Sequence, residues 1–168
     1  MNSKPLLVIE DSPEDVQLIL HALRAVLPRE NVAVCNSGED ALDYLYARDP
    51  QENRSIRLQP RLVLLDLNLP RMSGLDMLRR IRATPETRLL PVVILSVSAE
   101  QQDIRSAMQA GANSYIRKSM DFAKLNESMV LLARYWLELN IEPQTWPQVP
   151  PRLARASAPA AFTPPLGG

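Results

Sequence analysis

The 168-residue chain is long enough for one ordinary domain and too short for two well-packed ones. Its 19 basic and 19 acidic residues cancel, so charge gives no reason to expect nucleic acid or an anionic membrane as a partner. No apolar run approaches the roughly 18 residues that a membrane span needs. The N-terminus turns acidic where a secretory signal would stay apolar, and the single cysteine, Cys35, excludes an internal disulfide framework. These features predict a cytoplasmic protein.

Short apolar runs alternate with helical patterns along the chain. The runs are rich in branched aliphatic residues and too short for core helices, which is typical of buried strands. We expect strands at residues 6–9, 31–35, 62–65, 92–95 and 114–117, and helices at 12–27, 37–46, 73–81, 99–110 and 121–140. Residues 49–59 are polar and aperiodic, which predicts a loop.

Capping signals mark several helix ends. Ser12 is placed as an N-cap, with Pro13 at the first helical position and Asp15 three residues after the cap. Ser73 is expected to cap the third helix. Gly111 is expected to end the fourth helix in the left-handed conformation, which glycine adopts without strain.

The alternation of strands and helices predicts the fold class. Parallel neighbours need crossover connections, so five strand–helix repeats indicate a doubly wound α/β domain over residues 1–141. The segment 62–65 is apolar at every position, as expected for a parallel strand covered on both faces. Residues 142–168 are rich in proline and alanine and lack periodic apolar spacing, which is typical of a disordered tail.

Polar side chains follow four of the expected strands. Glu10 and Asp11 end the first strand, Asp66 the third and Ser96 the fourth, while Lys118 follows the fifth. In a doubly wound sheet these positions meet at the carboxyl edge. Carboxylates about 4 Å apart repel each other by roughly 1 kcal/mol in water, and by more where water is scarce. A hard divalent ion with oxygen ligands, Mg²⁺ above all, would offset that repulsion.

These residues carry a family resemblance, which covers residues 5 to about 140. The pattern Glu10-Asp11, Asp66-Leu67-Asn68-Leu69-Pro70, Ser96, Ala110-Gly111-Ala112 and Lys118 resembles the receiver domain of two-component response regulators. The resemblance implies a flavodoxin-like parallel sheet of five strands in the order 2-1-3-4-5, flanked by five helices. It also implies a phosphoacceptor signalling protein that is not an enzyme, beyond catalysing its own phosphotransfer and dephosphorylation.

The resemblance implies a role for each matching residue of the acidic pocket. Asp66 is similar to the family's phosphoacceptor, which takes a phosphoryl group from a histidine kinase. Glu10 and Asp11 match the acidic pair that holds Mg²⁺ together with Asp66, and Asn68 is placed to offer its backbone carbonyl as a further ligand.

Three further positions match the residues that sense the phosphoryl group. Lys118 resembles the lysine that pairs with the phosphoryl oxygens, and Ser96 the hydroxyl residue that hydrogen-bonds them. Tyr115 resembles the aromatic residue whose rotamer follows that hydroxyl, which would couple the chemistry to a surface.

The chain departs from the family pattern in three places. Ser119 follows Lys118 where a cis proline is usual, so either the bond before it is a strained cis bond or the loop differs locally. Val97 is bulkier than the usual small residue and is expected to restrict access to the phosphoryl group. The loop 49–59 is longer than usual.

Other functions fit the residues less well. A phosphatase of the haloacid-dehalogenase type needs an aspartate as general acid two positions after its nucleophile, where this chain has Asn68. A flavodoxin-like cofactor binder needs phosphate-cradling donors after the first strand, where the chain has the acidic turn 12–15. A pseudo-receiver that only binds a partner would lack part of the pocket. A phosphate shuttle or sink in a multi-step relay remains open.

The last helix and the tail suggest partners. One apolar stripe is expected to face the sheet: Phe122, Leu125, Met129, Leu132, Trp136 and Leu139. Further apolar residues widen the arc and suggest a homodimer: Val130, Leu131, Leu137 and Ile141. The segment 142–147, with Trp146 as anchor, would extend that contact as an exchanged arm; the alternative is a plain disordered tail.

The kind of kinase is suggested by a closer resemblance. The single-domain architecture, the long loop 49–59 and the stretches 94–98 and 134–137 resemble regulators that serve phytochrome-type histidine kinases. No DNA-binding or catalytic segment follows the expected domain, so we expect output through protein contacts.

Overall fold

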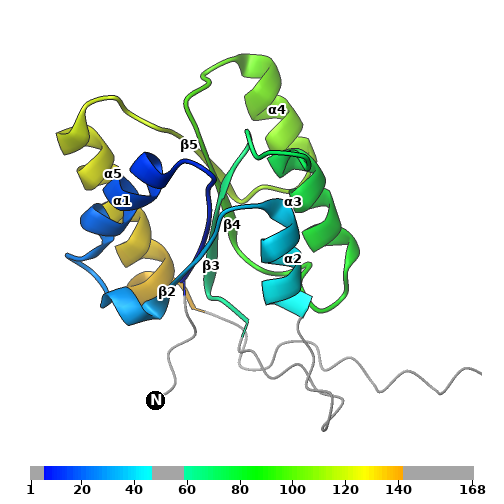
Figure 1. The fold of residues 1–168 in the computed structure, drawn as a ribbon, viewed down its shortest axis with the longest axis horizontal. Helices are drawn as coiled ribbons and strands as arrows, with labels where there is room; N and C mark the ends of the chain where they lie inside the picture. The colour runs from blue at the N-terminus through cyan, green and yellow to red at the C-terminus, as the bar shows by residue number, and fades with distance from the viewer. Residues whose placement is uncertain (1–5, 47–58, 142–168) are drawn as a thin grey trace, which may run out of the picture.

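The structure, a computed structural model, describes residues 6–46 and 59–141 and contains one five-stranded parallel sheet (Figure 1). The strands are β1 Leu6–Ile9, β2 Val32–Cys35, β3 Leu62–Asp66, β4 Val92–Ser96 and β5 Ser114–Arg117. The helices are α1 Pro13–Leu23, α2 Gly38–Tyr46, α3 Gly74–Ala83, α4 Gln101–Gln109 and α5 Phe122–Arg134. The strand order is β2-β1-β3-β4-β5, which confirms the predicted doubly wound fold.

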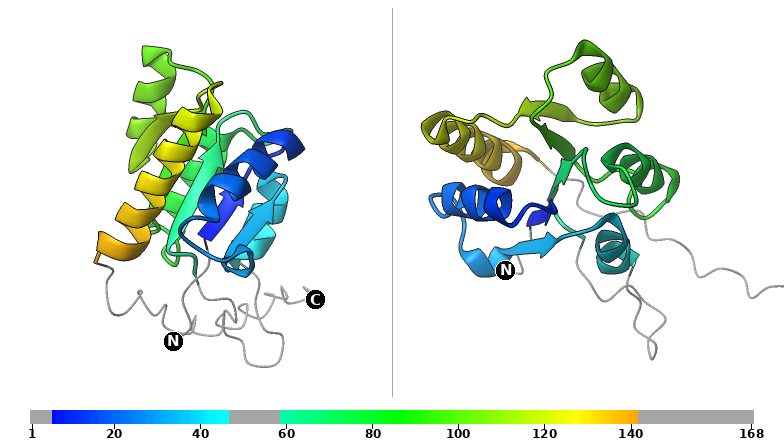
Figure 2. Two further views of the ribbon diagram at one scale, coloured as in Figure 1. Left: turned by 90° about the vertical axis from the view of Figure 1, so that its left-hand side faces the viewer. Right: turned by 45° about the horizontal axis from the view of Figure 1, so that its top comes forward.

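Helices cover both faces of the sheet. Helices α1 and α5 lie on one face, and α2, α3 and α4 on the other (Figures 1 and 2). Alternate residues of each inner strand enter opposite cores: Leu62 and Leu64 pack under α1 and α5, and Val63 and Leu65 under the other three helices. A strand that supplies two cores must be apolar at every position, which explains the unbroken apolar runs.

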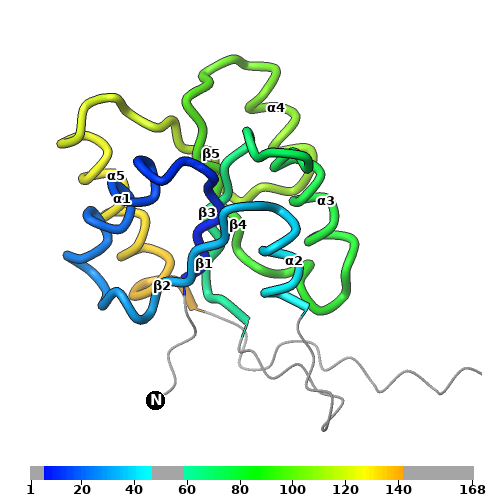
Figure 3. The backbone as a smooth tube through the Cα atoms, viewed as in Figure 1, coloured from blue at the N-terminus to red at the C-terminus, as the bar shows by residue number. Residues whose placement is uncertain are grey.

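The predicted helix caps are confirmed. The backbone N–H of Asp15 donates to Ser12 Oγ at 3.2 Å, and that of Asp76 donates to Ser73 Oγ at 3.1 Å. Gly111 has a φ of +97°, the left-handed conformation expected after α4. The connections after β1 and β3 leave the same end of the sheet (Figure 3). The two helix N-termini that Ser12 and Ser73 cap therefore both lie at its carboxyl edge.

Some predicted boundaries were wrong by one or two residues, and helix α1 ends at Leu23, four residues before the predicted end at residue 27. Strand β2 begins at Val32, because Arg29–Asn31 forms a 3-10 turn, and α4 begins at Gln101. Residues 47–58 and 142–168 lie outside the described residues, so the predicted loop at 49–59 and the interpretations placed on 142–168 stay predictions. No helix within 6–46 and 59–141 is long and apolar enough to cross a membrane.

The predicted sheet-facing stripe of the last helix was wrong at both ends. Residues Leu125, Met129 and Leu132 are buried as expected, but Phe122 is 44% exposed and Leu139 is 72% exposed. Phe122 is the first residue of α5, where its ring lies 5.4 Å from that of His21. After α5 the chain continues as a π-helix, η2 (Tyr135–Leu139), whose wider turn carries Leu139 off the face that a 3.6-residue period predicts.

Candidate functional site

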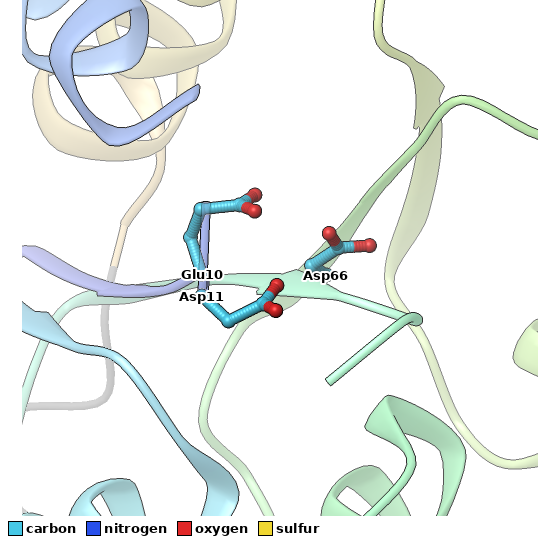
Figure 4. Close-up of side chains that lie close together, drawn as sticks. All are labelled: Glu10, Asp11 and Asp66. Carbon is cyan, nitrogen blue, oxygen red and sulfur yellow. The ribbon is translucent and has the colours of Figure 1, made fainter. Parts of the chain in front are cut away.

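Three carboxylates meet at the carboxyl edge of the sheet, as predicted (Figure 4). Glu10 and Asp11 follow β1, Asp66 ends β3, and one oxygen of each lies within 4.8 Å of the others. The pairing of β1 with β3 aligns Ile9 with Leu65, so the residues after them are neighbours. Glu10 and Asp66 are buried and Asp11 is exposed. Oxygen donors at this spacing suit a hard divalent cation.

Lys118 supplies the positive charge that the pocket contains. It follows β5, is only 9% exposed, and donates from Nζ to Glu10 Oε2 at 2.5 Å and Asp66 Oδ2 at 2.9 Å. Its third contact is Asp15 Oδ2, at 2.8 Å, from the first turn of α1. An ammonium group has three N–H donors, so the three carboxylates use all of them.

Asp15 is the pocket residue that the sequence prediction missed. Its place in the first turn of α1 is as predicted, but the prediction did not assign its carboxylate to the site. The available signal was its position one helical turn after Asp11, which directs the side chain back toward the strand end.

Burial and charge shift the pKa values of two pocket residues. Burial raises the pKa of Glu10 to about 7, and the charge of Asp66 adds to this, while the hydrogen bond from Lys118 opposes it. Burial by itself would lower the pKa of Lys118. The carboxylates of Asp15, Glu10 and Asp66 outweigh burial and hold that pKa above its ordinary value, so the ammonium form persists at neutral pH.

The end of β3 is held close to the start of α3. Asp66 Oδ1 accepts from the backbone N–H of Asn68 at 3.1 Å, and the N–H of Gly74 donates to the Leu67 carbonyl at 2.9 Å. A Cβ on Gly74 would lie 2.1 Å from the Asp66 carbonyl oxygen, so only glycine permits this approach. The carboxylate of Asp66 is therefore positioned by backbone contacts.

Ser96 and Tyr115 are linked through one residue, Ser98. Ser96 is fully buried at the end of β4, and its Oγ accepts from the Ser98 N–H at 3.2 Å. Tyr115 Oη donates to the Ser98 carbonyl at 3.0 Å. The structure thus connects the two predicted switch residues, although by an intermediary that the sequence did not indicate.

Two departures from the family pattern can be located. The described residues contain no cis peptide bond, so the bond between Lys118 and Ser119 is trans and the loop differs locally from the family pattern. Val97 is 55% exposed beside Ser96, and its predicted effect on access stays a prediction.

Comparison with known proteins identifies the family. Residues 6–130 match the family model described as "Response regulator receiver domain". The chain belongs to this family. The receiver family comprises phosphoacceptor signalling proteins of two-component systems, whose partners are histidine kinases.

The relatives of this receiver include phytochrome response regulators. Response regulator Rcp1 of Synechocystis is 30% identical over 80% of this chain and 90% of its own length. Its Mn²⁺-bound crystal structure matches with a TM-score of 0.73 at 29% identity, covering 83% of this chain and 99% of that one. The phosphorylated cyanobacterial phytochrome response regulator RcpA matches with a TM-score of 0.71 at 31% identity, covering 82% and 96%.

Proposed function

We propose that Asp66 accepts a phosphoryl group from a phosphohistidine of a histidine kinase. The observation that carries this proposal is the position of Asp66, which is buried, 2.9 Å from Lys118 Nζ and grouped with two further carboxylates. A carboxylate held next to a permanent cation and an oxygen-donor cation site suits attack on a phosphoryl group, whose transfer depends on positioning and charge neutralisation.

The chemistry follows from the residues at the sheet edge. An Asp66 carboxylate oxygen attacks the phosphorus in line, the phosphorus–nitrogen bond to the donor histidine breaks, and its electron pair stays on the imidazole nitrogen. The product is an acyl phosphate on Asp66. Lys118 turns one N–H toward a phosphoryl oxygen and neutralises part of its charge.

Mg²⁺ is the cofactor that we propose for this site. Glu10, Asp11 and Asp66 would supply carboxylate oxygens and Asn68 its backbone carbonyl. Bound there, the ion neutralises charge on the phosphoryl oxygens during transfer. The gathering of the three carboxylate oxygens and the Mn²⁺ bound by the related Rcp1 support a divalent-cation site.

Ser96 and Tyr115 form the proposed switch. A phosphoryl group on Asp66 offers Ser96 Oγ a strong acceptor, which draws the hydroxyl away from the Ser98 N–H. That movement releases the loop whose Ser98 carbonyl now holds Tyr115 Oη, so the ring becomes free to turn inward. The Tyr115 rotamer would then report phosphorylation to the surface formed by α4, β5 and α5.

We propose a phytochrome-type histidine kinase as the phosphodonor, met in the cytoplasm. The similarity to phytochrome response regulators supports this choice. The chain then acts as a phosphoacceptor that turns over no separate substrate, and its output is a protein contact.

A homodimer through the last helix is part of the same proposal. Leu131, Tyr135 and Leu139 follow each other at four-residue intervals and are 62%, 53% and 72% exposed. An apolar stripe of this kind suits a symmetric contact. Sedimentation at equal concentration, with and without beryllium fluoride as phosphoryl mimic, should show more dimer with the mimic. Equal weight-average masses with and without the mimic would remove the link between phosphorylation and dimerisation. Leu131→Glu should abolish dimer formation.

The first test of the proposed function is the intact mass after incubation with acetyl phosphate and Mg²⁺. We expect one added phosphoryl group in the parent and none in Asp66→Asn or after chelation of the metal. Circular dichroism of both proteins controls for folding. A folded parent that gains no mass, or an Asp66→Asn variant that gains it, would contradict the assignment.

A further inference from the structure

The Lys118 ammonium group has a third carboxylate partner, Asp15, that lies outside the cluster of candidate metal ligands. We propose that Asp15 is a positioning residue of the phosphorylation site. It holds Lys118 Nζ beside Asp66 while phosphoryl transfer removes the negative charge of the Asp66 carboxylate. This inference rests on the proposed function of Asp66.

The local structure of α1 fixes Asp15 for this task. Its backbone N–H donates to the N-cap Ser12 Oγ at 3.2 Å, which anchors the residue in the first helical turn. Its carboxylate then reaches Lys118 Nζ at 2.8 Å, while its side chain stays 34% exposed. Asp15 therefore combines a fixed backbone with a carboxylate at the rim of the pocket.

The three partners of Lys118 change differently during transfer. Asp66 loses its carboxylate charge when it becomes an acyl phosphate. Glu10 is one of the three clustered carboxylates, so a bound cation shares its charge. Asp15 alone keeps a full charge toward Lys118, because it neither reacts nor belongs to that cluster.

Lysine needs such an anchor because its stem is flexible. Four rotatable bonds let an ammonium group move away from a position that no longer attracts it. In the resting protein Glu10 and Asp66 hold Lys118 even without Asp15. The loss of Asp15 should therefore leave the fold in place and act on the transfer step.

The test compares Asp15→Asn with Glu14→Gln, a matched control. Exposed Glu14 lies in the same turn, and its carboxylate accepts from the Ser12 hydroxyl at 3.3 Å rather than from Lys118. Both variants remove one negative charge. The measured quantity is the rate constant for phosphorylation by acetyl phosphate at saturating Mg²⁺, which removes effects on metal affinity.

We expect the rate constant to fall about tenfold in Asp15→Asn, equivalent to about 1.4 kcal/mol of the activation barrier. The acetyl phosphate concentration at half-maximal rate should stay near the parental value. Glu14→Gln should match the parent in both quantities. Asp15→Glu, which keeps the charge, should recover part of the lost rate. Equal rate constants in Asp15→Asn and Glu14→Gln, or a faster Asp15→Asn, would overturn the proposal.

A second measurement needs neither metal nor phosphodonor. An ammonium group held by three carboxylates exchanges its protons slowly, so its ¹H–¹⁵N signal should be visible in the metal-free parent. In Asp15→Asn, Glu10 and Asp66 still hold the ammonium group, but one of its three N–H groups loses its charged acceptor and exchanges faster with water. The Lys118 signal should therefore broaden in Asp15→Asn and stay unchanged in Glu14→Gln. An unchanged signal in Asp15→Asn would also overturn the proposal. If the parent is never phosphorylated, the proposed function fails, while the signal still decides whether Asp15 positions Lys118.

Discussion

Replacing Gly74 by alanine should disturb the proposed phosphorylation site indirectly, through the backbone of Asp66. Gly74 is the first residue of α3 and carries no side chain that could contact a phosphoryl group. A Cβ at this position would lie 2.1 Å from the Asp66 carbonyl oxygen and 2.7 Å from Leu67 Cα. Both contacts are with backbone, so no side-chain rotation can relieve them.

The size of the effect follows from these distances. The end of β3 and the start of α3 must separate by roughly 1 Å before the Cβ fits. Overpacking of this kind costs about 1–3 kcal/mol. The higher helix propensity of alanine returns at most about 1 kcal/mol. We therefore expect the free energy of unfolding to fall by between about 0 and 3 kcal/mol. A misplacement of this size at Asp66 can slow phosphorylation by about 100-fold.

Urea unfolding and phosphorylation by acetyl phosphate, followed by intact mass, measure the two effects. Gly38→Ala is the matched control, because a Cβ there meets the flexible Met72 side chain, with Sδ at 3.1 Å. That variant should remain close to the parent in both assays. A Gly74→Ala protein with parental stability and parental phosphorylation rate would refute the reasoning.

Three further changes test other parts of the structure. Ser73→Ala removes the oxygen that accepts from the Asp76 N–H and should lower the free energy of unfolding in urea by about 1 kcal/mol; an unchanged midpoint would contradict the cap. Gly111→Ala forces a side chain into φ +97° and should cost about 1–2 kcal/mol in the same assay, so a stabilised variant would show that the turn relaxes. Mg²⁺ at about 100 times its Kd should raise the free energy of unfolding by about 2.7 kcal/mol. Asp11→Asn should reduce that gain, and an equal gain in the variant would remove Asp11 from the proposed ligands.

The fold class and the main members of the pocket follow from sequence patterns alone. Unbroken apolar runs such as 62–65 report burial on both faces, and strand–helix alternation requires parallel crossovers. Parallel strands present their carboxyl ends at one edge, so Glu10, Asp11 and Asp66 had to meet there. The order of residues along the chain was sufficient to predict these pocket members, because each of them is placed by the position at which a strand ends.

Which side chains touch depends on tertiary packing. Lys118 and Asp15 are 103 residues apart, and their contact depends on the reach of a lysine across several strands, which no periodicity encodes. No periodicity encodes the contacts of Ser98 either: its backbone N–H donates to Ser96 and its carbonyl accepts from Tyr115. The exposure of Leu139 depends on a π-turn that breaks the 3.6-residue period. A pattern in sequence fixes where a strand or helix lies, whereas the contacts between elements arise from packing in three dimensions.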